Sequence, residues 1–460
     1  MVFSSDVFLF LFLPAVLFFY YVVCRKSIRA KNIILLLSSL FFYAWGEPAV
    51  VFLMILSIVV NYFFGLHMDG KHRKGILIIS VLFNLSFLFV FKYLDFALET
   101  AGFLLGRKLA GVGIALPIGI SFYTFQSLSY VVDVYRGKVA PQRNLMNLGL
   151  YVALFPQLIA GPIVRYSTIE QQILGRRESL QTFSSGVERF IIGLAKKMLI
   201  ANNVGFLADT IYGLQPAQLN TAFLWLAAIA YTLQIYYDFS GYSDMAIGLG
   251  KLFGFTFEEN FNYPYIANSV TDFWRRWHIS LSGWFRDYVY IPLGGNRVRK
   301  GRHIFNLFVT WLCTGLWHGA NWTFVVWGLY FFVFLILEKH WKTDKVPGLL
   351  SHVYTMLVVV ISWVIFRAQD LSSALYYLGE MFRFELGSFA GADFLWYLKN
   401  FAAILALGIF FTMPVGRKLN QWLEQKDLIW LRHILLMLLL LLCVSFMFRS
   451  SYNPFIYFNF

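Results

Sequence analysis

Residues 7–23 of the chain read VFLFLFLPAVLFFYYVV, an unbroken apolar run that ends at a block of basic residues. A run of this length, followed by Arg25 and Lys26, is typical of a helix that crosses a membrane and stops at its surface. Similar apolar runs recur along all 460 residues. This repetition predicts an all-α, polytopic integral membrane protein and not a soluble protein with a single anchor.

The composition indicates the same fold class. Hydrophobic residues make up 59% of the chain and charged residues 13%, whereas an ordinary soluble domain has about 45–50% and about 25%. These values exclude a soluble enzyme, a disordered chain and a fibrous protein. At about 20 residues per crossing plus connections, the chain has room for roughly 11–13 spans. We expect these spans to form a single membrane domain over residues 1–460.

The net charge of +14 is concentrated between the apolar runs. Loops rich in Lys and Arg stay in the cytoplasm, and the basic blocks at 25–31 and 71–74 are separated by two predicted crossings, 32–45 and 49–66. Both blocks therefore fall on one side, which places the N-terminus outside. The same clustering argues against nucleic-acid binding. The three cysteines have neither disulfide nor metal-ligand spacing, so we expect no metal site.

Two regions are unsuited to a simple crossing. Residues 146–200 contain Phe155-Pro156 and Gly161-Pro162 within an apolar run, and residues 256–302 are aromatic and rich in arginine. Irregular or polar backbone at membrane depth is tolerated only where protein surrounds it. We therefore expect a re-entrant or broken helix in the first region and short helices folded into the bundle in the second.

Two carboxylates, Asp238 and Asp244, lie in the middle of the apolar segment 221–250. A charged side chain at the bilayer centre costs on the order of 2.5–3.5 kcal/mol, so neither residue is expected to face lipid. One explanation is structural, with hydrogen bonds to Tyr and Arg side chains of neighbouring helices. The other is a role in proton transfer, and the sequence leaves both open.

Seven basic residues lie between Arg275 and Arg302. A cytoplasmic belt that binds anionic lipid head groups explains them, and a dock for a donor that carries several phosphates is the alternative. In the second case Arg275, Arg276, Arg286 and the neighbouring Trp277 are candidate substrate-binding residues.

The segment GLWHGANW, residues 315–322, places His318 between two apolar runs and between Gly315 and Gly319. Glycines there allow another backbone or a ligand to approach the imidazole, and Asn321 is a further candidate substrate-binding residue. A lone intramembrane histidine is commonly a hydrogen-bonded packing residue. The chemical alternative is a general base, because imidazole is mostly neutral near pH 7. Neutral imidazole in a site shielded from water can deprotonate a hydroxyl that attacks an acyl thioester.

Together these segments resemble the membrane-bound O-acyltransferase family, within it the bacterial branch of alginate O-acetylation and D-alanyl transfer. The resemblance covers about the first 370 residues and is carried by FYAW (42–45), LPIGISFY (116–123), DVYRG (133–137), Gly161-Pro162, the 238–244 segment, FWRRWHISLS (273–282) and WHGAN (317–321).

The resemblance implies that His318 is the catalytic histidine of the family and that His278 occupies its second polar position. It also implies a bundle of about eleven spans in which re-entrant helices thin the centre to a funnel. The implied activity is transfer of an acetyl group from a cytoplasmic thioester, acetyl-CoA, toward a hydroxyl of a cell-envelope polysaccharide, with no bound cofactor. Proteins of this kind work in the bacterial inner membrane, often with an extracytoplasmic acetyltransferase as partner.

The alternative function is a transporter or channel subunit for an anionic solute or polymer. Asp238, Asp244 and a basic cytoplasmic mouth would also suit such a conduit.

Overall fold

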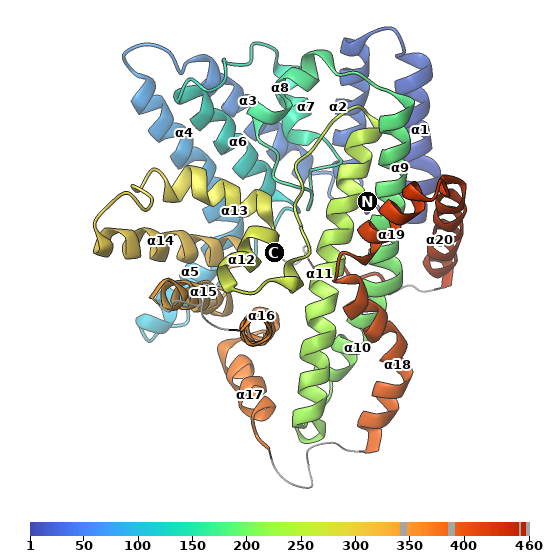
Figure 1. The fold of residues 1–460 in the computed structure, drawn as a ribbon. Helices are drawn as coiled ribbons and strands as arrows, with labels where there is room; N and C mark the ends of the chain where they lie inside the picture. Colours follow the sequence, from blue (N-terminus) through green and yellow to red (C-terminus); the bar gives the residue numbers. More distant parts are fainter. Residues whose placement is uncertain (341–346, 385–391, 450–451, 457–460) are drawn as a thin grey trace. The chain divides into compact units, whose positions relative to one another are not determined.

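The computed structural model describes residues 1–340, 347–384, 392–449 and 452–456, and every regular element within these ranges is a helix (Figure 1). The all-α prediction is therefore confirmed. The chain divides into two compact units, the first made of residues 1–190 and 243–258 and the second of residues 191–242 and 259–460. Helix α11 (Thr221–Leu252) contributes to both units.

The first unit is a set of packed helices in which α6 lies innermost and is buried along most of its length. Helix α6 packs against α3 and α4, and α7 packs against α2 and α3. In chain order the elements are η1 (Val7–Phe12), α1 (Leu13–Phe18), η2 (Phe19–Val23), α2 (Ile28–Ala44), α3 (Val50–Leu66), α4 (Arg73–Leu88), η3 (Phe89–Tyr93), α5 (Leu94–Leu104), α6 (Ile120–Tyr135), α7 (Leu145–Ala153), α8 (Tyr166–Gly175) and α9 (Leu180–Ala195), whose last turn belongs to the second unit.

Between α7 and α8 the chain is non-helical, and residues 154–164 are all buried. Two prolines in this segment lack the N–H that a helix needs. A Cβ atom on Gly161 would lie 2.6 Å from the Cα atom of Gln157, so only glycine fits there. The Tyr151 hydroxyl donates to the Val164 carbonyl at 3.0 Å, which satisfies part of the irregular backbone without water. The predicted interruption of the apolar run is thus confirmed.

The second unit carries short helices in the aromatic and arginine-rich region, as predicted, followed by longer helices. In chain order its elements are η4 (Lys196–Ala201), α10 (Asn202–Tyr212), η5 (Pro216–Gln218), the first part of α11, η6 (Pro264–Ile266), α12 (Val270–Arg276), α13 (Ile279–Phe285), η7 (Arg286–Tyr290), α14 (Lys300–His318), α15 (Trp322–His340), α16 (Gly348–Arg367), α17 (Leu371–Met381), α18 (Ala392–Phe411), α19 (Val415–Gln425) and α20 (Ile429–Arg449).

Helices α14, α15 and α16 pack in sequence within this unit. Two glycines allow α14 and α15 to approach closely, because a Cβ atom on Gly328 would lie 3.1 Å from the Cα atom of Gly315. Gly315 was expected to admit either another backbone or a ligand, and in the structure it admits the backbone of α15. This contact fixes the C-terminal end of α14, where His318 lies.

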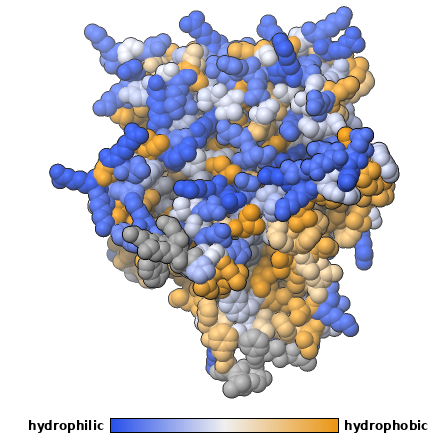
Figure 2. Space-filling model, in the orientation of Figure 1, coloured by the Kyte–Doolittle hydropathy of each residue, from blue (hydrophilic) through white to orange (hydrophobic). Residues whose placement is uncertain are grey.

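Six helices of the described ranges are long and apolar enough to cross a membrane: Arg73–Leu104, Leu180–Tyr212, Trp322–His340, Gly348–Arg367, Asp393–Phe411 and Ile429–Arg449. Figure 2 shows hydrophobic side chains gathered over α18, whose exposed residues include Leu407, Ile409 and Phe410. An exposed apolar face of this kind suits contact with lipid acyl chains. The protein is therefore a multi-pass membrane protein. The prediction of 11–13 crossings is not tested by these six helices. Helices α11 and α14 contain polar residues, so length and hydropathy alone do not decide whether they cross the membrane.

Candidate active site

His278 lies in the turn between α12 and α13, with its side chain fully buried in the second unit. Its backbone φ is 43°, a left-handed conformation that residues with a Cβ atom rarely adopt. Helix α12 is anchored to α15 because the Glu338 carboxylate accepts the backbone N–H groups of Val270 at 2.5 Å and Thr271 at 2.9 Å. The turn that carries His278 is therefore held in place from its N-terminal side.

The imidazole of His278 has one hydrogen-bond partner among the described residues. Its Nδ1 atom lies 3.0 Å from the amide oxygen of Asn260, and the Phe239 ring stands perpendicular to it at 4.6 Å between centroids. His278 lies outside the six apolar helices, and burial lowers its pKa to about 3. The side chain is thus neutral near pH 7, as a proton acceptor must be.

His318 is the last residue of α14 and is 3% exposed. Three aromatic rings surround its imidazole, with centroid distances of 4.9 Å to Trp327, 5.0 Å to Trp317 and 5.2 Å to Phe366. The chain then turns into α15, where Asn321 accepts the Thr323 N–H through its side-chain oxygen at 3.0 Å. The aromatic walls provide an apolar surrounding that excludes water.

Trp317 joins the two histidines. Its ring centroid lies 5.0 Å from that of His318 and 5.9 Å from that of His278. We call His278, His318 and Trp317 the histidine core. The structure thus brings together two imidazoles that are forty positions apart in the sequence, each in contact with aromatic rings.

The other predicted substrate-binding residues are spread over the same region. Arg275 is exposed, Arg276 forms an ion pair with Asp272 at 3.0 Å, and Arg286 pairs with the adjacent Asp287 at 2.8 Å.

Two of the predicted residues have structural contacts. Trp277 is 1% exposed and stacks with Phe273, at 5.5 Å between ring centroids. The amide nitrogen of Asn321 donates to the Gln369 carbonyl at 2.7 Å. The structure therefore leaves Arg275 and Arg286 as the most accessible of the five.

Both carboxylates of α11 are compensated by a cation. Asp244 forms an ion pair with Arg189 at 2.6 Å within the first unit. Asp238 forms one with Lys197 at 2.6 Å within the second unit, and both side chains are almost fully buried. We expected tyrosine or arginine as partners, and the partner of Asp238 is a lysine, because η4 places Lys197 beside α11.

The segment 452–456 closes over the Lys197–Asp238 pair. Lys197 donates to the Pro454 carbonyl, and the backbone N–H of Ile456 donates to Asp238 at 2.9 Å. Phe455 packs against Tyr242 with ring centroids 4.8 Å apart. The buried pair therefore has backbone partners as well as its own charges.

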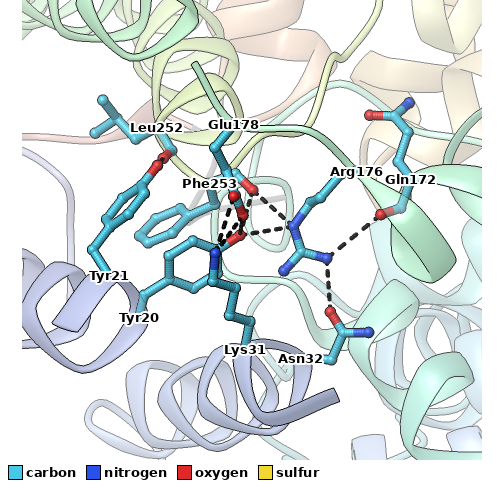
Figure 3. Close-up of polar contacts among 9 residues, drawn as sticks. All are labelled: Tyr20, Tyr21, Lys31, Asn32, Gln172, Arg176, Glu178, Leu252 and Phe253. Carbon is cyan, nitrogen blue, oxygen red and sulfur yellow. Dashed lines mark hydrogen bonds and ion pairs between the residues drawn. The ribbon is translucent and has the colours of Figure 1, made fainter. Parts of the chain in front are cut away.

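A second buried polar cluster lies in the first unit (Figure 3). Lys31 forms an ion pair with Glu178 at 2.9 Å, and the Tyr20 hydroxyl donates to the same carboxylate at 2.7 Å. Arg176 donates from Nη1 to the side-chain oxygen of Asn32 at 2.7 Å and from Nε to the Phe253 carbonyl at 2.8 Å. We call Tyr20, Lys31, Asn32, Arg176 and Glu178 the ionic cluster.

The ionic cluster connects η2, α2, the segment after α8 and Phe253, the residue that follows α11. Burial raises the pKa of Glu178, but the hydrogen bonds from Tyr20 and Lys31 outweigh this and hold it below its usual value. The carboxylate is therefore ionised and paired, which suits a structural role.

The family model of the membrane-bound O-acyltransferases, MBOAT, matches residues 40–377, which include both histidines. The chain belongs to the membrane-bound O-acyltransferase family. It is therefore a membrane acyltransferase, and the predicted resemblance is confirmed. The matched range includes parts of both units.

Three relatives show which branch of the family this acyltransferase resembles. It is 41% identical to a probable alginate O-acetylase AlgI of Pseudomonas putida over the full length of both chains. It is 45% identical to the protein of the same name from Pseudomonas aeruginosa, over 84% of this chain and 75% of that protein. A peptidoglycan O-acetyltransferase of Helicobacter pylori is 33% identical over 100% of this chain and 98% of that protein.

Sequence reasoning missed three residues that position the site or its surroundings: Asn260, Glu338 and Lys197. Glu338 and Lys197 carry charges beside apolar runs, which is a detectable signal. Asn260 lies in an ordinary polar loop and has no such signal.

Proposed function

We propose that this acyltransferase moves an acetyl group from a thioester donor, acetyl-CoA, toward a hydroxyl of a cell-envelope polysaccharide. Transfer is direct or runs through a separate extracytoplasmic acetyltransferase. The relatives named above support the acyl group and the acceptor class, since their names specify O-acetylation of alginate or peptidoglycan. The observation that carries the proposal is the contact of both buried histidines with Trp317.

In the proposed mechanism His318 is the general base. Its imidazole takes the proton of the acceptor hydroxyl as the oxygen forms a bond to the thioester carbonyl carbon. The C–S bond then breaks, and the imidazolium returns the proton to the departing thiolate. The rings of Trp317, Trp327 and Phe366 exclude water, which would otherwise hydrolyse the thioester.

The other predicted residues keep supporting roles in this proposal. His278 is a neutral hydrogen-bonding partner of the reacting groups, and Trp277, which stacks with Phe273, holds the end of α12 that precedes it. Arg275 and Arg286, with Arg276, bind the phosphates of the donor through charge-assisted hydrogen bonds. Asn321 binds substrate near the end of α14.

The proposed location is the bacterial cytoplasmic membrane, with the N-terminus outside. The donor is made in the cytoplasm and the polysaccharide is modified outside, so His318 has to be reachable from both faces. In this proposal a narrow tunnel begins beside the basic belt of residues 275–302 and meets a wider outer funnel at His318. A bundle about 30 Å thick allows this only if irregular or short segments thin it, and the short helices α12 and α13 in the same unit as His318 support such thinning.

The orientation is tested by accessibility labelling of single-cysteine variants in intact cells. A cysteine at Gly46 is expected to react with an impermeant reagent from outside, because the positive-inside rule places this turn there. A cysteine at Arg73 is expected to react only after permeabilisation. The reverse pattern contradicts the orientation.

The activity is tested with purified acyltransferase in lipid nanodiscs, radiolabelled acetyl-CoA and a mannuronate oligosaccharide. We expect free thiol release together with label in the oligosaccharide. Thiol release that requires an added extracytoplasmic acetyltransferase supports the relayed form. Absence of thioester cleavage under both conditions contradicts the proposal.

A further inference from the structure

Three hydrogen-bonding groups converge on one atom, the side-chain amide oxygen of Asn260. The backbone N–H of Ser280 lies 3.2 Å from it, the Ser280 hydroxyl oxygen 2.9 Å, and Nδ1 of His278 3.0 Å. Asn260 is 1% exposed, and its backbone carbonyl accepts the N–H of Ile279 at 3.0 Å. This one residue therefore holds the turn between α12 and α13 through both its side chain and its backbone.

The convergence determines which nitrogen of His278 carries the proton. A backbone N–H can only donate, so the atom of Asn260 that faces Ser280 must be the amide oxygen. That oxygen has no hydrogen to give, so Nδ1 of His278 must be the donor in the third contact. In the neutral imidazole the proton lies on Nδ1, and Nε2 is left with a lone pair.

The Nε2 atom of His278 is buried and has no hydrogen-bond partner among the residues that the structure describes. A buried acceptor left unsatisfied costs about 1–3 kcal/mol. The backbone of the same residue has a φ of 43°, a left-handed conformation that costs roughly 1–2 kcal/mol for a residue with a side chain. Strain and an open acceptor at one residue are typical of a site that binds a ligand.

We infer that Asn260 is a positioning residue of the acyltransferase, which holds His278 in the Nδ1–H tautomer and keeps Nε2 free to accept a hydrogen bond from a second hydroxyl of the sugar acceptor, beside the one that His318 deprotonates. The inference rests on the proposed function for the identity of the hydroxyl and on the geometry alone for the tautomer. Ser280 supports Asn260 by donating twice to the same oxygen.

The tautomer is tested by ¹⁵N NMR of the full-length protein labelled at the histidine ring nitrogens. Subtraction of the spectrum of His278→Gln assigns the signal of His278. We expect a neutral ring with the hydrogen on Nδ1. An Nε2–H tautomer or an imidazolium at this position in the unmodified protein overturns the inference. The measurement needs no substrate, so it tests the tautomer of His278 independently of the proposed function.

The role in transfer is tested by the pH dependence of kcat in Asn260→Asp. Three uncharged groups of the described residues contact His278, namely Phe239 from α11, Trp317 from α14 and Asn260 itself. His318, which also contacts Trp317, is titratable. A carboxylate in place of the amide raises the pKa of His278, because an opposite charge favours the imidazolium. We expect the acid limb of the profile to move up by about one pH unit or more.

Asn262→Asp is the matched control, because Asn262 is exposed and lies in the same loop. A purely structural role predicts loss of activity at all pH values without a shifted limb. Coincident limbs for Asn260→Asp and Asn262→Asp overturn the positioning role.

Asn260→Leu removes the acceptor without adding a charge. We expect kcat to fall about 10–100-fold while the donor KM changes little, which is the range for loss of a residue that orients a reacting group. If Asn260→Leu does not fold, Ser280→Ala provides the second variant, because it removes one donor to Asn260 and leaves the backbone N–H. A rise in donor KM with unchanged kcat in the folded variant contradicts the inference.

Discussion

The ionic cluster of the first unit and the histidine core of the second unit both bury polar side chains, but they stabilise them differently. In the ionic cluster a carboxylate and an ammonium group lie 2.9 Å apart, and Tyr20 adds a hydrogen bond to the carboxylate. In the histidine core two imidazole rings are surrounded by Trp and Phe, and Nε2 of His278 has no hydrogen-bond partner in the described ranges.

The difference shows how to distinguish structural from chemical burial of polar groups. A paired charge cannot take up or release a proton at neutral pH without losing its partner, and removal of one partner destabilises the fold because the other charge is left uncompensated. A neutral imidazole in an apolar surrounding can accept a proton during a reaction and return it. The comparison therefore predicts that substitutions in the histidine core affect turnover, whereas substitutions in the ionic cluster affect stability.

The largest expected effect is that of His318→Ala, which removes the proposed base. We expect acetyl transfer to be abolished, a loss of about 10²–10⁴-fold or more, because no other group takes the proton. Melting temperature and elution volume in detergent are expected to stay near those of the unmodified protein. His340→Ala, an exposed histidine of the same unit, is the control and should remain active. Substantial activity of His318→Ala contradicts the assignment.

His278→Ala is expected to damage activity less than His318→Ala. Water can occupy the space of the imidazole and supply part of its hydrogen bonding. Single-turnover rates for both variants give the comparison directly. Equal and complete loss at both positions would instead indicate that the two histidines act as one base pair.

Lys31→Met tests the ionic cluster. It leaves the Glu178 carboxylate without its ammonium partner, so we expect a loss of about 1–3 kcal/mol in stability with unchanged kcat per folded molecule. Thermal unfolding in detergent measures the first quantity and acetyl transfer the second. Lys26→Met, at an exposed position, is the control. If Lys31→Met lowers kcat without lowering stability, the proposed difference between the ionic cluster and the histidine core is wrong.

The sign of the pH dependence follows from the lowered pKa of Glu178. Its pairing stabilises the folded state above the unfolded pKa of about 4.5, and this contribution is lost as the pH falls through the lower folded value. The difference between Lys31→Met and the unmodified protein should therefore shrink below that range.

The smallest effect is expected for charge reversal at the basic belt. Arg275→Glu and Arg286→Glu should raise the KM for acetyl-CoA by about fivefold, which corresponds to roughly 1 kcal/mol for one exposed charge contact, and lower kcat less. Arg276→Glu also breaks the ion pair with Asp272, so its effect combines weaker donor binding with the loss of that pair. Lys418→Glu on α19 is the control. Unchanged donor KM in both variants indicates that the donor does not bind at this belt.

Much of the helical pattern could be predicted because lipid requires long apolar helices. The predicted crossings 32–45 and 49–66 correspond to α2 (Ile28–Ala44) and α3 (Val50–Leu66). Helix α19 (Val415–Gln425) escaped prediction, because it is short and strongly amphipathic and its charged residues interrupt any apolar run.

The candidate site was only partly predictable. His318 was visible because it lies between two apolar runs, and the role of His278 followed only from the family resemblance. Their shared contact with Trp317 depends on tertiary packing. Asn260 lies 18 residues before His278 and carries no charge that would reveal it. The pairing of Lys197 with Asp238 joins two helices and has no local sequence signal. Contacts between residues that only tertiary packing brings together cannot be predicted from periodicity and composition.

The segment 452–456 is synthesised late but contacts a buried ion pair of the second unit. The ribosome makes these residues after every other described part of the second unit. During synthesis Asp238 therefore lacks its backbone partner Ile456, which lies 218 residues further along the chain. Until then its buried ion pair with Lys197 lacks the bonds to Ile456 and Pro454. A chain that stops before Tyr452 therefore has its defect at Asp238, in the middle of α11 and 218 residues before Ile456 in the sequence.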